Sequence, residues 1–241
     1  MKIRIADLNV EIHNRYPYLE NLCRDYLAEF ETADITVTVT PDQIAKEQAA
    51  AQGKTPPSPG YAEGICAYRA VAMELPRFSA FVFHAAVVEH KGVAYAFSAQ
   101  SGTGKTTHVR LWLKAFGEQA AVINGDKPIL RFFGDTLYAY GTPWCGKEGM
   151  QINRRAPLRA LCFLERAPEN SICPIDDADA VHRLFSQVVM PSGRSEVILF
   201  LDLLDQTVKN LPTYLLSCNM QQEAALVALN GMSKGEQYDS Q

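Results

Sequence analysis

Seven consecutive residues near the middle of the chain have the types and spacing that hold a polyphosphate. They follow an apolar stretch at 95–97 and read Ser101, Gly102, Thr103, Gly104, Lys105, Thr106 and Thr107. Closely spaced anionic oxygens can be held by converging backbone N–H groups when little side chain stands in the way. Gly102 and Gly104 meet that requirement.

The residues after the glycines supply charge and a metal ligand. A helix that begins near Lys105 offers unpaired N–H groups and the positive end of its dipole to phosphate. Lys105 can reach the β- and γ-phosphates, and the hydroxyl of Thr106 is placed to bind Mg²⁺. Ala99 stands where the Walker A pattern has its first glycine, and alanine is the smallest replacement. The sequence therefore predicts a P-loop that binds ATP and Mg²⁺.

A carboxylate at the end of a neighbouring strand is the second requirement of such a site, because it holds the metal or its waters. Asp126 ends the apolar run at 120–124, and Gly125 before it lets the backbone approach closely. The same Asn-Gly-Asp string also favours an ordinary turn. Given the upstream loop, we expect Asp126 to be functional.

Two further basic residues are candidates for contacts to phosphate or to a phosphoryl acceptor. Lys147 lies in a glycine-rich segment at 140–149, which is either a mobile loop that closes on the phosphates or a plain surface hairpin. Arg131 lies on a strand soon after Asp126 and could face the site. The alternative for Arg131 is a solvated strand position.

Strands and helices must position these residues, and the pattern of apolar side chains predicts where they lie. Strands are expected at 2–12, 34–40, 81–89, 92–97, 120–124, 129–133, 136–140, 159–165 and 213–217. Helices are expected at 16–30, 41–51, 61–75, 105–116, 178–189, 194–208 and 221–229. This order predicts an α/β nucleotide-binding core at 61–232 behind a small α+β N-terminal part at 1–60. Residues 52–60 are the best linker candidate, and 233–241 form a polar tail.

Composition excludes several other classes of function. The 241 residues are 47% apolar and 21% charged with a formal net charge of -4, and no run of Lys or Arg suggests binding to nucleic acid. No apolar stretch approaches the roughly 20 residues that span a membrane. The six cysteines form no C-x-x-C pair, so we expect reduced thiols in a cytoplasmic protein.

The site residues resemble those of the HPr kinase/phosphorylase family and, more distantly, of ATP-dependent phosphoenolpyruvate carboxykinase. The string from Ser101 to Thr107 is similar to the carboxykinase version of the phosphate loop. His84 matches a histidine that opens the strand pair leading into the loop of HPr kinases. Gly125-Asp126 falls where the family has a pair of aspartates. The resemblance covers roughly 83–133 well and the rest loosely.

The resemblance implies a P-loop core of the HPr kinase and carboxykinase type that transfers phosphate from ATP to a hydroxyl. Carried over, His84 and Asp126 lie near the attacking hydroxyl, Asp126 acts as a base, and Lys105 binds phosphate. Thr106 and Asp126 bind Mg²⁺. Since only one aspartate of the pair is present, Asp126 serves as base or as metal partner, or His84 assists. HPr kinases also assemble, which implies a homo-oligomer.

Three functions are compatible with these residues. The first is an ATP- and Mg²⁺-dependent kinase whose acceptor is a protein serine or a small molecule with a hydroxyl group. The second is a non-catalytic ATP-binding sensor or scaffold, motivated by the missing second aspartate and by Ala99. The third is a carboxykinase-like lyase that acts on a keto acid. Neither nucleic acid nor a membrane is an expected partner.

Overall fold

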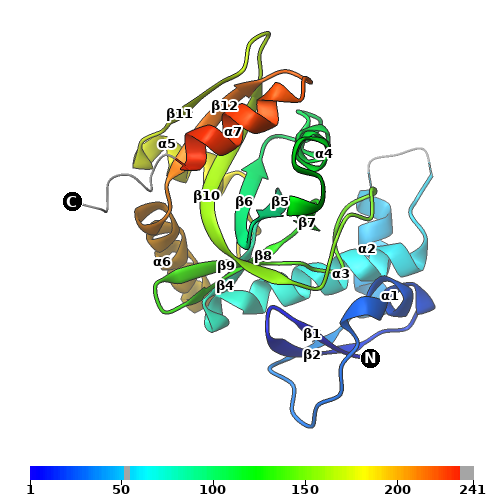
Figure 1. The fold of residues 1–241 in the computed structure, drawn as a ribbon. Helices are drawn as coiled ribbons and strands as arrows, with labels where there is room; N and C mark the ends of the chain where they lie inside the picture. Colours follow the sequence, from blue (N-terminus) through cyan, green and yellow to red (C-terminus); the bar gives the residue numbers. More distant parts are fainter. Residues whose placement is uncertain (52–54, 234–241) are drawn as a thin grey trace.

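The computed structural model describes residues 1–51 and 55–233, and it has a mixed α/β architecture with a curled sheet (Figure 1). The first three residues of the predicted linker, 52–54, and nearly all of the predicted tail lie outside the described residues. Among the helices of the described chain, none combines the length and the apolar character that crossing a membrane requires.

A small sheet comes first in the chain. Strand β2 (Leu8–His13) pairs antiparallel with β1 (Lys2–Ile5) and parallel with β3 (Ile35–Thr38). The single strand expected at 2–12 is wrong, because Ala6 and Asp7 adopt positive φ angles of 50° and 56° and turn the chain back on itself. In both strands, the alternating apolar side chains nevertheless point to the buried face, as the sequence pattern predicted.

Helices cover this small sheet. They are α1 (Pro17–Leu22), the 3₁₀ turn η1 (Arg24–Tyr26), α2 (Pro41–Ala50) and α3 (Pro59–Glu74). The helix expected at 16–30 is wrong beyond residue 22, where the chain tightens into η1 and buries Tyr26 in the core. Helix α2 begins with a capping box, in which the side chains of Thr40 and Gln43 each accept a hydrogen bond from the other's backbone N–H.

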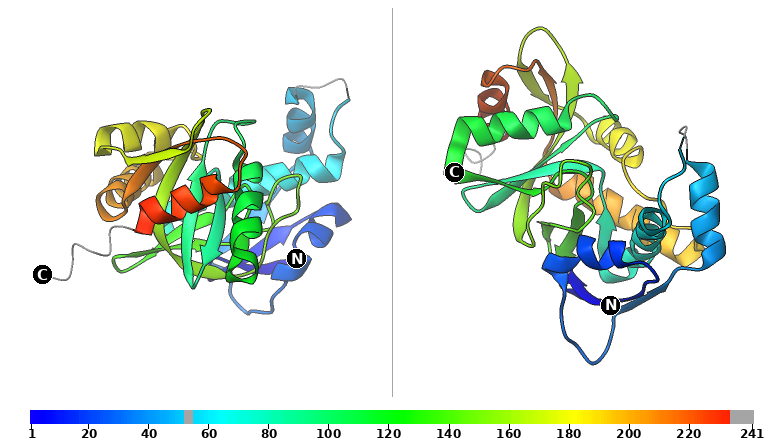
Figure 2. Two further views of the ribbon diagram at one scale, coloured as in Figure 1. Left: turned by 45° about the horizontal axis from the view of Figure 1, so that its top comes forward. Right: turned by 90° about the vertical axis from the view of Figure 1, so that its right-hand side faces the viewer.

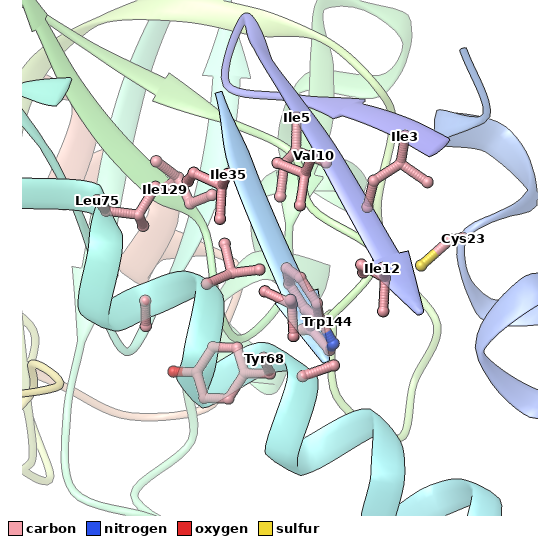
Figure 3. Packing of buried hydrophobic residues seen from close by; sticks show 14 of the residues in the cluster. Ile3, Ile5, Val10, Ile12, Cys23, Ile35, Tyr68, Leu75, Ile129 and Trp144 are labelled. Atoms are coloured by element: carbon pink, nitrogen blue, oxygen red, sulfur yellow. The ribbon is translucent and has the colours of Figure 1, made fainter. Parts of the chain in front are cut away.

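Helix α3 packs with the N-terminal strands, and Figure 3 shows Tyr68 beside Trp144 and Leu75 beside Ile129. Two glycines on α3 allow α1 to pack closely against it. A Cβ added to Gly60 would lie 2.7 Å from Cβ of Tyr18, and a Cβ added to Gly64 would lie 3.3 Å from the ring of Tyr18. Tyr18 therefore rests directly on α3. The domain boundary between residues 60 and 61 stays a prediction.

The larger sheet follows the order β4-β8-β9-β10-β6-β5-β7, with β12 beside β10 and β11 beside β12. Its strands are β4 (Ala80–Val82), β5 (Ala85–His90), β6 (Val93–Ser98), β7 (Ala120–Asn124), β8 (Ile129–Phe133), β9 (Thr136–Tyr140), β10 (Arg155–Arg166), β11 (Ser171–Pro174) and β12 (Thr213–Cys218). Strand β10 pairs antiparallel with β9 and parallel with both β6 and β12.

The expected strand at 81–89 is interrupted where a functional residue was predicted. Phe83 forms an isolated bridge with Val188, and the N–H of His84 donates to the carbonyl oxygen of Gln187 at 2.7 Å. These contacts take the two residues out of the sheet ladder and divide the segment into β4 and β5. Strand β11 was not expected, and β10 begins earlier than predicted.

Both faces of the larger sheet are buried under helices. Along β5, Ala85 and Val87 pack toward α5 (Asp177–Phe185) and α6 (Arg194–Asn210), while Ala86 and Val88 pack toward α4 (Lys105–Phe116) and α7 (Glu223–Ser233). Figures 1 and 2 show the two helix pairs on opposite sides. A strand that is buried on both faces reads as a nearly continuous apolar run, which is how β5 and β6 read.

Candidate functional site

The predicted phosphate loop connects the end of β6 with the start of α4. Gly102 and Gly104 adopt φ angles of 80° and 132°, which side chains of L-residues rarely allow. The first bond within α4 runs from the N–H of His108 to the carbonyl oxygen of Gly104 at 2.9 Å. The backbone N–H groups of residues 105–107 therefore precede the helical ladder and are available to an anion.

Lys105 is folded back onto this loop. Its Nζ donates to the carbonyl oxygen of Ala99 at 2.9 Å, and the residue is only 8% exposed. Burial lowers the pKa of the Lys105 ammonium group, and the charge of Asp126 opposes that change. A bound phosphate would supply the negative partner that favours the charged form.

Arg166 at the end of β10 anchors the phosphate loop, and sequence reasoning missed it. Its Nε donates to the carbonyl oxygen of Thr103 at 2.9 Å, and its Nη2 donates to that of Gly102. In a planar trans peptide, the C=O and the following N–H point in opposite directions. The bond to Thr103 therefore turns the N–H of Gly104 away from Arg166. No local pattern relates Arg166 to a loop so distant in the chain.

The structure brings His84 and Asp126 together. His84 Nε2 lies 3.1 Å from Asp126 Oδ1, and Lys127 Nζ lies 3.1 Å from Oδ2 of the same carboxylate. On the other side of the imidazole, Nδ1 lies 2.9 Å from Oε1 of Gln187. Burial alone raises the pKa of Asp126, but the hydrogen bond from His84 and the charge of Lys127 outweigh it. The pKa of Asp126 is therefore lowered, and its carboxylate is ionised at neutral pH.

Asn124 sets the orientation of this carboxylate and is a second residue that sequence reasoning missed. Its Oδ1 accepts hydrogen bonds from the N–H groups of Asp126 at 2.9 Å and Lys127 at 2.7 Å. Its Nδ2 donates to the carbonyl oxygen and to Oγ1 of Thr142. The Asn-Gly-Asp string therefore forms a turn, which was one of the two alternatives that the sequence left open, and this turn positions the side chain of Asp126. The asparagine could have indicated this arrangement in the sequence, because Asn side chains commonly bond to the backbone of turns.

The glycine-rich segment after β9 packs tightly against this turn. A Cβ added to Gly125 would lie 3.2 Å from the carbonyl oxygen of Cys145, and one added to Gly146 would lie 3.1 Å from Cβ of Asp126. Residues 141–145 are buried, whereas residues 146–149 are exposed and include Lys147. Glu148 forms an ion pair with Arg110 of α4. Whether the exposed half closes on a ligand stays a prediction.

The tight packing of the glycine-rich segment requires that residue 141 has no side chain. A Cβ added there would lie 1.9 Å from the carbonyl oxygen of Ile152 and 2.9 Å from that of Ile123. Because both are backbone atoms, Gly141→Ala is expected to lower the free energy of unfolding by about 3 kcal/mol. Urea denaturation measures this effect. Gly149→Ala is the control, since its added Cβ contacts nothing and only the positive φ of 67° is strained, at roughly 1 kcal/mol. Equal losses in the two variants would contradict the prediction.

Two cavities meet at the phosphate loop. The first has a volume of about 870 Å³, and the second has a volume of about 780 Å³. Ser101 and Gly102 line both. The predicted site residues that line the first cavity are Ser101, Gly102, Gly104, Lys105, Thr106, His84, Asp126 and Lys147. The second is lined by the first half of the loop, including Thr103, and by residues of β10 and α5, including Arg166 and Arg183.

Two of the residues predicted for the site, Arg131 and Thr107, lie outside the linings of both cavities. Arg131 is not among the described residues that line either cavity, and its guanidinium donates to the carbonyl oxygens of Ala6 at 2.6 Å and Phe78 at 3.2 Å. It therefore joins the turn between β1 and β2 to the larger sheet, and the expectation that it faces the site is wrong. Thr107 is exposed on α4 and is likewise outside both linings.

The residues around the first cavity fit a magnesium ion that is shared with phosphate. The Thr106 hydroxyl and the Asp126 carboxylate offer hard oxygen ligands, and both residues line this cavity. In the described part of the chain, no group of three or more His, Cys, Asp or Glu side chains is arranged to hold a metal alone. Magnesium commonly takes one or two protein ligands and completes its shell with phosphate oxygens and water.

Comparison with solved structures shows a distant likeness in fold. No protein-family model matches this chain, and no curated protein sequence matches it. The HPr(Ser) kinase/phosphatase from Coxiella burnetii has a similar solved structure, with a TM-score of 0.41 and 12% sequence identity. The match covers 66% of this chain and 94% of that chain.

Proposed function

We propose that this protein is an ATP- and Mg²⁺-dependent kinase that transfers the γ-phosphoryl group to a hydroxyl acceptor. One observation carries the proposal. The cationic end of the phosphate loop, with Lys105 and Thr106, lines the same cavity as the paired side chains of His84 and Asp126. A group that binds triphosphate and a group that activates a hydroxyl therefore face a common space.

The two cavities suggest how ATP lies across the loop. Because Ser101 and Gly102 line both, a polyphosphate on the loop has one end in each. Lys105 and Asp126 line only the first cavity, so the γ-phosphate and the acceptor belong there. The nucleoside then extends toward the second cavity, where Phe163 and Leu164 offer apolar surface.

In the proposed reaction, the acceptor oxygen forms a bond to the γ-phosphorus as the bond from that phosphorus to the β,γ-bridging oxygen breaks. The electron pair of the broken bond stays on the departing ADP. The acceptor proton passes to the carboxylate of Asp126, which His84 and Lys127 hold in place. Little proton transfer is needed before the phosphoryl group moves, so a weakly basic carboxylate suffices.

The protein contributes charge to this step. Lys105 and the free N–H groups at the start of α4 stabilise the negative charge that gathers on the transferred phosphoryl group. Thr106 and Asp126 would hold Mg²⁺, which neutralises the phosphate oxygens when bound. Lys127 and Lys147 line the same cavity and add to its positive potential.

Arg166 provides a test of the phosphate loop that leaves the catalytic groups intact. Without its two hydrogen bonds, the carbonyl groups of Gly102 and Thr103 are freer to rotate and the loop is less well ordered for phosphate. Arg166→Ala is expected to raise the Kd for ATP about tenfold, as measured by titration calorimetry. Arg77→Ala is the control, since Arg77 is exposed and pairs with Glu74 away from both cavities. An unchanged Kd in Arg166→Ala would contradict the anchoring role.

Turnover separates the kinase from the second candidate, a non-catalytic ATP-binding module. That candidate is favoured by the engagement of both Asp126 oxygens with protein cations, which leaves the carboxylate less free to act as a base. The protein is incubated with Mg²⁺ and ATP labelled at the γ-phosphate, and the products are separated. Label on an acceptor supports the kinase. Tight ATP binding with no label released or transferred over a broad set of acceptors supports the binding module.

A further inference from the structure

Gln187, in the segment after α5, binds His84 at two points. Its carbonyl oxygen accepts the backbone N–H of His84 at 2.7 Å, and Oε1 of its side chain lies 2.9 Å from Nδ1 of the His84 ring. In addition, Oγ of Ser98 donates to the carbonyl oxygen of His84 at 2.9 Å. These bonds to the backbone fix where His84 lies between β4 and β5. The side chain of Gln187 therefore acts on the imidazole alone.

We propose that Gln187 is a positioning residue for the phosphoryl transfer, and that it acts by holding the imidazole of His84 with Nε2 toward Asp126. The inference rests on the proposed function, because it gives that reaction one further residue. Two observations carry it: the orientation of the Gln187 amide, and the hydrogen bonds on both sides of the imidazole.

The amide of Gln187 is oriented by its neighbour Ser186. The hydroxyl of Ser186 donates its one hydrogen to the carbonyl oxygen of Arg183 at 2.8 Å, so its oxygen is free to accept. Nε2 of Gln187 lies 3.0 Å from that oxygen and donates to it. The carbonyl half of the amide, which only accepts hydrogen bonds, therefore faces His84.

The imidazole of His84 is consequently held on both sides. Because Oε1 of Gln187 is an acceptor, Nδ1 of His84 carries the hydrogen of that bond, and Nε2 is left to face Oδ1 of Asp126 at 3.1 Å. The torsion that turns an imidazole is soft, so a bond at Nε2 alone would let the ring swing. The bond at Nδ1 restricts this motion. A ring kept in one plane keeps the carboxylate of Asp126 aimed at the acceptor hydroxyl, as proton removal requires.

A contact with the nucleoside is the alternative role for Gln187. Gln187 lines the second cavity and His84 lines the first, so the bond between them joins the two linings. In the proposed reaction the nucleoside extends toward the second cavity. The two roles differ in what they change, because a nucleoside contact affects the Kd for ATP, whereas the position of His84 affects kcat.

Gln187→Met removes the acceptor and keeps the length of the side chain. We expect kcat for transfer of the γ-label of ATP, to an acceptor or to water, to fall about tenfold, the lower end of the range for supporting partners of a site histidine. The Kd for ATP, measured by calorimetry, is expected to stay within about twofold. Gln119→Met, at an exposed position outside both cavity linings, is the control. An unchanged kcat overturns the inference, whether or not the Kd for ATP rises.

Two further variants show whether the effect passes through the hydrogen bond to His84. Gln187→Glu keeps an oxygen acceptor beside Nδ1, so its kcat is expected to stay within about threefold of the original value. In a His84→Ala background there is no ring to hold, so adding Gln187→Met is expected to change the remaining rate less than about twofold. The inference is wrong if Gln187→Glu loses as much kcat as Gln187→Met, or if Gln187→Met has the same effect with and without the imidazole.

Nitrogen NMR of the imidazole follows the hydrogen bond without turnover. The ring signals of His84, assigned by their absence in His84→Ala, report which nitrogen carries a hydrogen. We expect Nδ1–H in the original protein and in Gln187→Glu, and a changed Nδ1 signal in Gln187→Met. Signals that are the same in Gln187→Met as in the original protein overturn the inference.

The two proposals fail in different ways. If label moves at an unchanged rate in Gln187→Met, the positioning role is wrong and the kinase stands. If ATP does not bind, or binds and no label moves, the kinase is wrong, and the positioning role falls with it even where NMR shows that Gln187 holds the ring.

Discussion

Replacing Lys105 with methionine is expected to lower kcat/KM for ATP by about 10³-fold. Lys105 is the buried cation of the phosphate loop, and its amine lies over the carbonyl oxygen of Ala99. Removing a preorganised charge from the transition state typically costs roughly 10²- to 10³-fold, and this lysine also binds the ground-state phosphates. Methionine keeps most of the apolar stem, so the packing of α4 against the sheet is preserved.

Stability and a matched lysine separate catalysis from folding in this experiment. Burial of the ammonium group is itself unfavourable, as the lowered pKa of Lys105 indicates. The loss of the Ala99 bond and the relief of that burial therefore oppose each other, and the Tm is expected to change by only a few degrees. Lys114→Met, at an exposed position of the same helix, is the control and should keep full activity. Full turnover in Lys105→Met with every acceptor that is tested would disprove the kinase.

Asp126→Asn is expected to lower kcat by about 10²- to 10⁴-fold, the usual range for removal of a general acid or base. The amide keeps the shape of the side chain and its contacts in the turn that Asn124 holds. It cannot accept the proton of the attacking hydroxyl, and it leaves His84 and Lys127 without their anionic partner. The rate of label transfer under saturating ATP measures the effect.

The same variant separates the two roles proposed for Asp126. If the carboxylate mainly binds the metal, the concentration of Mg²⁺ needed for half-maximal ATP binding should rise at least tenfold. If it mainly serves as the base, that concentration should stay within about twofold while kcat falls. Asp135→Asn, in the exposed turn between β8 and β9, is the control. An Asp126→Asn enzyme with unchanged kcat would exclude both roles.

Local sequence signals predicted the part of the fold that positions the phosphate loop. Helix α4 and strands β7, β8 and β9 have the predicted bounds. Each is a short, regular apolar pattern that ends at glycine, aspartate or asparagine, so its limits are encoded by neighbouring residues. The structure also places His84 and Asp126 in contact, as the resemblance implied, although their chemical roles stay proposals.

Contacts between distant residues could not be predicted in this way. Arg166 reaches the phosphate loop across more than sixty positions, and Gln187 reaches His84 across more than one hundred. The interruption of the strand expected at 81–89 has the same origin, because the segment after α5 takes the hydrogen bond of His84. The position of Arg131 has the same kind of cause, because one of the two carbonyl groups that hold its guanidinium belongs to Ala6, in a turn near the N-terminus.

Strand β10 has a consequence for how the molecule opens. At one end, Arg155 forms an ion pair with Asp7 in the turn of the small sheet, and at the other, Arg166 holds the phosphate loop. Between them, the strand shares its amide ladder with β9, β6 and β12 (Figure 1). Separating either end would break hydrogen bonds along the strand. Deuterium should therefore enter the β10 amides only when the whole molecule unfolds, at one slow and nearly uniform rate.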